Sequence, residues 1–342
     1  ERGSVVVPTE WEGKLERGSV VALRGPDEGS SSHYMATAKL LASPEFRVRI
    51  SAGRSDAPET IRELLASQLL SQTGCVPTFF ERQVFADATF MMTEYVGGRT
   101  LEALVKERSA RANKHPAVPL QQALPLMMDL LRGIQSMEHL SIVHGDLSEA
   151  NVYLVDGDRR AVITNFHHAC LQDTADERLD CAVKEGSLPK GSELRQAPET
   201  RETSGGTAGN VWQLGLVFAR MMFGGDVPTE ATVLEKMSTA DMAKLAASVM
   251  KDGSSGEVRE RVREVIQRHF SISQAEGFER LQGEYEDVLN ILVGMLAKDP
   301  DDRWTASQAL QALEALCAAR DVPVPGPRPQ AELPEGLVED WQ

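Results

Sequence analysis

The chain has 342 residues, 42% hydrophobic and 25% charged, a composition that indicates one large or two coupled globular domains and excludes a disordered or collagen-like chain. Its 51 acidic and 36 basic residues give a formal net charge of −15, so a nucleic-acid partner is not expected. No apolar run approaches the roughly 20 residues of a membrane-spanning helix, so we expect a soluble chain without a transmembrane segment. The chain starts at Glu1 without a basic and apolar leader, which we interpret as a processed piece.

The segment from Ser4 to about Tyr95 predicts a small sheet with one helix. Short apolar runs alternate there with turn residues, as in strands: SVVVP, GSVVALRG, HYMATAKLL, FRVRIS and ATFMMTEYV. One helix interrupts them, because Pro58 opens the stretch TIRELLASQLLSQ, whose apolar residues recur at helical spacing.

From Thr100 onward long amphipathic stretches predict a mostly helical region: LEALVKERSARA, QQALPLMMDLLRGIQSMEHL, VWQLGLVFARMMFG, VLEKMSTADMAKLAASVM and YEDVLNILVGMLAKD. Within it, IVHGDLSEANVYLVDGDRRAVITNF predicts a loop and then two short strands around the turn DGD. The Pro-rich end, DVPVPGPRPQAELPEGLVEDWQ, is expected to lie extended along the surface.

The four cysteines form no zinc-binding pattern. Cys170 and Cys181 are near enough in sequence to form a disulfide in an oxidising compartment, and buried free thiols are an equal alternative.

A small sheet followed by a larger helical region, with a hairpin at their junction, is the arrangement of two lobes around a cleft. The junction carries His144, Gly145, Asp146 and Asn151 in a loop and then Asn165 after a strand. A carboxylate followed five residues later by a carboxamide can orient a hydroxyl and hold a metal ion. These segments, HGDLSEAN and TNFHH, resemble the catalytic loop and metal motif of the protein-kinase superfamily.

Three later segments resemble kinase scaffold motifs: APE ending at Glu199, NVWQLG starting at Asn210, and DPDDRW, whose Arg303 is expected to pair with Glu199. The resemblance implies an α+β, bilobal protein-kinase-like domain. It has an N-lobe antiparallel sheet with one main helix (residues 1–95), a helical C-lobe (96–320) and a Pro-rich C-terminal extension (321–342).

The nucleotide side of this pattern is degenerate. The phosphate-loop glycine positions fall near Pro26, Glu28 and Ser31, where proline has no N–H and the carboxylates of Asp27 and Glu28 would repel polyphosphate. A plain surface turn, or another alignment on nearby glycines, stays open. Arg49 stands where kinases carry a phosphate-contacting lysine, and a solvated strand residue is an equal reading.

The catalytic positions have also changed. Glu63 is the expected helix partner of Arg49, with Glu59 as the less favoured register. Ser148 replaces a phosphate-facing lysine, and Asn165 replaces the metal-binding aspartate, so a dipole replaces an anion.

Further changes surround these positions. Gly145 removes the cation that would hold a phosphorylated activation segment, and Asn210 is expected to weaken the support of the catalytic loop. His167 and His168 lack a third metal ligand. We therefore expect neither a metal nor a nucleotide cofactor.

Scaffold residues retained beside altered chemistry are typical of a pseudokinase. The degenerate phosphate loop and the segments HGDL and TNFHH most resemble those of the secreted rhoptry-type kinases and pseudokinases of apicomplexan parasites, in particular bradyzoite pseudokinases. This resemblance implies secretion into the parasitophorous vacuole or cyst wall and binding of other secreted or host proteins. Residues 233–278 and the Pro-rich end are the first candidate surfaces to test, and ordinary packing of the lobes is the favoured alternative for both. The alternatives are an unorthodox protein or small-molecule phosphotransferase that uses Asp146 and Asn151, and nucleotide binding without turnover through Arg49.

Overall fold

The computed structural model describes residues 34–39, 47–54, 57–85, 88–111, 118–172, 174–176, 179–181, 196–197, 199, 206–223, 286–297 and 299–332. The predicted phosphate loop at Pro26, Asp27, Glu28 and Ser31, and the candidate surface at 233–278, lie outside these residues.

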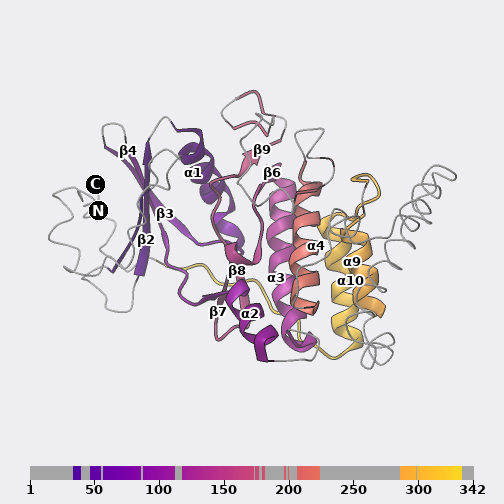
Figure 1. The fold of residues 1–342 in the computed structure, drawn as a ribbon. Coiled ribbons are helices and arrows are strands. Elements are labelled where there is room, and N and C mark those ends of the chain that lie inside the picture. The colour runs from indigo at the N-terminus through magenta and orange to yellow at the C-terminus, as the bar shows by residue number, and fades with distance from the viewer. Residues whose placement is uncertain are drawn as a thin grey trace.

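One lobe, the sheet lobe, consists of a four-stranded antiparallel sheet and one helix (Figure 1). The sheet has the order β1-β2-β4-β3 and consists of β1 (Tyr34–Lys39), β2 (Arg47–Arg54), β3 (Phe79–Phe85) and β4 (Ala88–Glu94). Helix α1 (Pro58–Leu70) has proline in its first turn, where the missing N–H has no helical partner to lose, and the short helix η2 (Ser71–Thr73) follows it. The sheet with one main helix agrees with the sequence prediction.

The other lobe, the helical lobe, is built around helix α3. Its described helices are α2 (Leu101–Arg111), α3 (Leu120–His139), α4 (Ala208–Phe223), α9 (Glu286–Met295) and α10 (Ala306–Ala319). Helix α3 contacts α4 and α10 and has a continuous buried apolar face that includes Leu124, Met127 and Leu131. The largest cluster of buried apolar side chains lies mainly in this lobe.

Small strands lie where the two lobes meet. Strands β5 (Arg99–Thr100), β7 (Val152–Val155) and β8 (Arg160–Ile163) form one antiparallel sheet, and β6 (Ile142–Val143) pairs with β9 (Cys170–Leu171). The β7–β8 hairpin turns through Asp156, Gly157 and Asp158, all at positive φ, as the DGD signal predicts. The loop 144–151 and residues 164–169 are thereby placed between the lobes.

The disulfide and the described end of the chain complete the fold. Cys170 is bonded to Cys181 with 5.0 Å between their Cα atoms, which selects the disulfide over free thiols for this pair. Residues 320–332 form neither helix nor strand, as expected for a Pro-rich segment. None of the described helices combines the length and hydrophobicity that crossing a bilayer requires.

Candidate functional site

The loop that carries Asp146 begins at His144, a wholly buried residue. The His144 N–H donates to the side-chain oxygen of Asn210 at 2.9 Å, and the ring packs against Phe166 with centroids 4.9 Å apart. Burial lowers the pKa of His144 to about 4, so the imidazole is neutral at pH 7. A neutral ring with its proton on Nε2 donates to the Thr164 carbonyl at 3.2 Å and accepts from the Asp146 N–H at 3.3 Å.

Three side-chain amides support the back of the loop. Asn210 accepts from the His144 N–H and donates to the Ile142 carbonyl at 2.9 Å, a pair of bonds that a carboxylate could not make. Gln213 accepts from the Leu147 N–H at 3.0 Å. Gln196 donates to the Gly145 carbonyl at 2.8 Å. The backbone of the loop is thus bonded from residues about 50 to 70 positions away in the chain.

Gln196 and Gln213 were not singled out by sequence analysis. Gln196 precedes Ala197 of the APE segment, and Gln213 lies within NVWQLG. Their position beside recognised scaffold motifs was the available signal, but neither amide has a partner nearby in sequence.

Gly145 has a geometric reason to be glycine. Its φ is +79°, and a Cβ atom there would lie 2.3 Å from the carbonyl oxygen of His168. A side chain of any kind at position 145 therefore requires both segments to move apart.

The cleft side of the loop is a chain of three polar side chains. Asn151 donates its amide to the Asp146 backbone carbonyl at 2.7 Å and to the Asp146 carboxylate at 3.0 Å. The amide oxygen of Asn151 accepts from the Asn165 amide at 3.0 Å. The structure therefore brings together Asp146, Asn151 and Asn165, and the two carboxamides are bonded to each other.

Asn165 itself is held in an unusual conformation. Its φ is +69°, in the left-handed region that asparagine tolerates better than other non-glycine residues. Its amide oxygen is buried and has no hydrogen-bond partner in the described part of the chain. Ser148 is also buried. Its backbone carbonyl accepts from the Asn151 N–H at 3.0 Å, and this bond closes the turn within the loop 144–151.

The donor set of this cleft does not fit a magnesium–nucleotide group. Mg²⁺ in such sites is held by anionic carboxylate oxygens together with phosphate, and position 165 offers only an amide. The described residues contain no group of three or more His, Cys, Asp or Glu side chains that could hold a metal ion. We therefore derive no reaction step through a metal or a nucleotide.

Glu63 of α1 reaches the same region. Its carboxylate is buried and lies 2.8 Å from Nδ1 of His167, the residue that stands two positions after Asn165. Burial also lowers the pKa of the adjacent His168. Helix α1 is thus joined to the segment after Asn165 by a carboxylate–imidazole contact.

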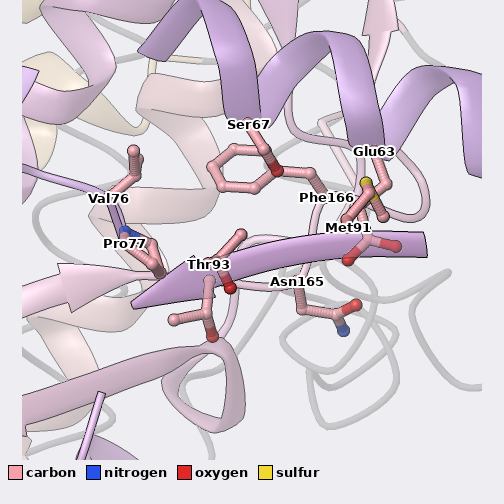
Figure 2. Close-up of a pocket in the computed structure, with 9 residues that line it drawn as sticks. Glu63, Ser67, Val76, Pro77, Met91, Thr93, Asn165 and Phe166 are labelled. Carbon is pink, nitrogen blue, oxygen red and sulfur yellow. The ribbon is translucent and has the colours of Figure 1, made fainter. Parts of the chain in front are cut away.

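A pocket lies between α1, β4 and Asn165 (Figure 2). Its empty space is about 360 Å³, open solvent included, and its lining consists of Glu63, Ser67, Val76, Pro77, Met91, Thr93, Thr164, Asn165 and Phe166. Two of the predicted site residues, Glu63 and Asn165, therefore face one pocket. Arg49 pairs in register with Thr93 of β4, which places its backbone beside this pocket, and its side chain lies outside the described residues.

The predicted scaffold residues meet away from the cleft. Arg303, whose side chain is fully buried, makes two hydrogen bonds to the Glu199 carboxylate, at 2.6 and 2.9 Å. It also donates to the carbonyls of Ala297 and Ala208 at 3.0 Å and lies 5.1 Å from the ring of Trp212. This arginine joins its own segment to residues 199–212, which lie about 100 positions earlier in the chain.

Comparison with known families places this geometry in a wider context. A family model described as "Protein kinase domain" matches residues 46–313, which is well over half of the chain. The match includes the cleft and scaffold residues described above, does not reach the predicted phosphate loop at Pro26–Ser31, and ends within α10.

Proposed function

The chain belongs to the protein kinase family, and from the side chains of its cleft we propose that it is a pseudokinase, a secreted scaffold or regulator that binds proteins and neither binds MgATP nor transfers phosphate. The observation that carries the proposal is Asn165. An amide stands where the reaction needs a metal-binding anion, and it is bonded to Asn151, the other residue expected to face the metal.

The contrast between cleft and scaffold supports this proposal. The Arg303–Glu199 pair fits the kinase scaffold pattern, and Asn210, although it was expected to weaken the support of the loop, is bonded to both His144 and Ile142. Asp146 keeps its carboxylate, but both that carboxylate and the Asp146 carbonyl accept hydrogen bonds from the Asn151 amide. A protein that keeps both lobes but lacks the metal ligand still has surfaces through which it can bind other proteins.

The disulfide supports the secreted location. Cysteine pairs such as Cys170–Cys181 persist in oxidising compartments and are rare in the reducing cytosol. The parasitophorous vacuole or cyst wall, and other secreted or host proteins as partners, follow from the rhoptry-type resemblance. Crosslinking with mass spectrometry in the native compartment tests both the location and the partners.

Nucleotide binding tests the central part of the proposal. Wild-type protein titrated with MgATP is expected to show no change in melting temperature and no calorimetric heat of binding. An Asn165→Asp variant is the matched control, since it restores the anion at nearly constant side-chain size and gives up only the N–H that Asn165 donates to Asn151. Micromolar binding by the wild type overturns the proposal. A melting shift without product would instead support nucleotide binding without turnover.

A second candidate is an unorthodox phosphotransferase. The observation in its favour is the 3.0 Å contact between Asp146 and Asn151, because the two residues that could orient a hydroxyl lie together at the cleft. Mass spectrometry for phosphate transfer to protein and small-molecule acceptors, with Asp146→Ala as the comparison, separates this candidate from the scaffold. Transfer that disappears in the variant establishes the phosphotransferase.

A further inference from the structure

The segment after α10 does not end in the helical lobe. Residues 322–332, which we name the C-terminal strap, leave the end of α10 and run back to the sheet lobe, as the yellow segment in Figure 1 shows. The strap contains four prolines, whose fixed φ lowers the entropy that an extended segment loses on docking.

The first half of the strap is bonded to the helical lobe. Val322 is buried, and its N–H donates to the Cys317 carbonyl at 2.9 Å. Arg132 of α3 donates to the Pro325 carbonyl at 2.5 Å, and Arg160 of β8 donates to the Gly326 carbonyl at 2.9 Å. Backbone carbonyls of the strap are therefore bound one after the other by arginines from two different elements.

Those two arginines are themselves held in place. Arg160 makes two hydrogen bonds to the buried carboxylate of Asp129, at 2.8 and 2.9 Å, and Arg132 lies 3.9 Å from the same group. Because one carboxylate orients both guanidinium groups, the binding site for the strap is preorganised on the helical lobe.

The second half of the strap is bonded to the sheet lobe through Arg328. Its guanidinium makes two 2.6 Å contacts with the carboxylate of Glu94, the last residue of β4, and both side chains are largely buried. It also donates to the Gly74 carbonyl at 3.2 Å. Farther along, the Ala331 N–H donates to the Thr78 hydroxyl at 3.1 Å.

The sheet lobe is shaped to receive the strap. Gly74 has φ +70°, and a Cβ atom there would lie 2.4 Å from the Arg328 carbonyl oxygen, so the strap passes where only glycine leaves room. Glu94 is oriented by the Thr78 N–H at 3.1 Å. Although burial raises the pKa of Glu94, its hydrogen bonds and the charge of Arg328 lower that pKa below its ordinary value.

The residues that bind the strap belong to the two parts of the chain that residues 95–98 connect: Glu94 precedes this link, and Arg132 and Arg160 follow it. Glu94 ends β4, and residues 95–98 then lead to β5 and the helical lobe. A second connection between the same two bodies, beside the first, restricts rotation about the link. In nucleotide-binding kinases hinge closure occurs around the ligand in the cleft, and this chain has a connection that needs no ligand.

We propose that the C-terminal strap fixes the angle between the lobes whether or not the cleft is occupied. It does so by connecting Arg132 and Arg160, which contact Asp129, to Glu94 of the sheet lobe. The surface that a partner meets is then held in one arrangement. The inference concerns lobe geometry and does not depend on the absence of nucleotide binding, so either proposal can fail alone.

The test measures the distance between the lobes in the full chain. Spin labels are attached at Gln68→Cys on α1 and Gln311→Cys on α10, both exposed positions. The native free thiols, Cys75 and Cys317, are buried, and burial raises the pKa of Cys75 to about 11, which suppresses its labelling. A chain without the two introduced cysteines reports any background labelling.

The expected result is a narrow distance distribution in the wild-type background and a distribution at least twice as broad, or shifted, in Arg328→Ala. Glu94→Gln provides a milder second variant, because the amide keeps an acceptor oxygen. The matched control is Arg99→Ala, which removes an arginine of β5 bonded to Glu107 of α2 and to Asp158 in the β7–β8 turn and which makes no contact with the strap in the described hydrogen bonds. Far-UV circular dichroism verifies that every variant is folded.

Two results overturn the proposal. One is an unchanged distribution in both Arg328→Ala and Glu94→Gln, which would make the strap ordinary surface packing. The other is equal broadening in Arg99→Ala, which would make the effect a general loss of stability. Broadening in the strap variants alone supports the proposal.

Discussion

The two sides of the loop 144–151 differ in how completely their polar groups are bonded. On the supported side, which faces the interior of the helical lobe, His144, Asn210 and Gln213 are buried and make hydrogen bonds of 2.9 to 3.0 Å with the loop or its flanking strand. On the cleft side, Asn151 and Asn165 bond to each other, and the Asn165 amide oxygen has no partner among the described residues. The contrast shows that the side chains that support the loop from behind are different from those that face the cleft.

The largest effect on stability is expected from Arg303, which lies away from the cleft and is bonded to Glu199. Arg303→Ala should lower the free energy of unfolding by about 3–5 kcal/mol, since it leaves the Glu199 carboxylate without its buried partner. Denaturant unfolding measures the loss. The matched control is Arg320→Ala, whose guanidinium lies 3.8 Å from the exposed Asp287 and should contribute less than about 1 kcal/mol. Equal losses in the two variants would contradict the comparison.

Asn210→Ala should be next, because it leaves one buried N–H and one buried C=O unpaired at about 1–3 kcal/mol for each group. Hydrogen exchange of the His144 amide should accelerate in parallel. Asn210→Asp keeps the acceptor and loses only the donor to Ile142, so it should fall between wild type and Asn210→Ala. If Asn210→Asp is as stable as wild type, the donated bond is not important.

The buried imidazole of the supported side predicts a dependence of stability on pH. The pKa of His144 is about 4 in the folded state, below its ordinary value of 6.5, so between these values the unfolded chain binds a proton that the folded chain does not. The contribution is complete above pH 6.5 and is lost as the pH falls to about 4, and it amounts to at most about 3 kcal/mol.

The measurement is the free energy of unfolding from pH 7 to 4 in wild type and His144→Gln. The variant should show a shallower decline. The lowered pKa of His168 acts in the same direction, and a His168→Gln variant isolates its part. Parallel curves for wild type and His144→Gln would show that the imidazole is not held neutral.

The smallest effect is expected on the cleft side. Asn165→Gly loses the bond to Asn151, worth about 0.5–1.5 kcal/mol, but glycine adopts φ +69° without steric cost, so the net change should stay within about 1 kcal/mol. Thermal unfolding provides the measurement, with Arg303→Ala as the large reference. A loss comparable to that of Arg303→Ala would erase the distinction between the two sides.

Sequence reasoning anticipated the elements more fully than the contacts. The helix opened by Pro58 and the DGD hairpin followed from local signals, and Glu63 was preferred over Glu59 on α1 as the expected partner of Arg49. The partner of Glu63 in the structure, His167, was foreseen only as an imidazole without a metal role. A pairing between helix α1 and a loop 100 residues away has no local signature.

Local periodicity and motif order determined from the sequence alone that this chain has a sheet lobe and a helical lobe, because those features depend on residues close together in the chain. Only the tertiary structure decided that Gly145 is required by the His168 carbonyl, that Gln196 and Gln213 hold the loop, and that Arg328 returns to Glu94. Each of these is a contact between segments distant in sequence. The energy of such a contact depends on distances and angles, which the types of the two residues do not determine.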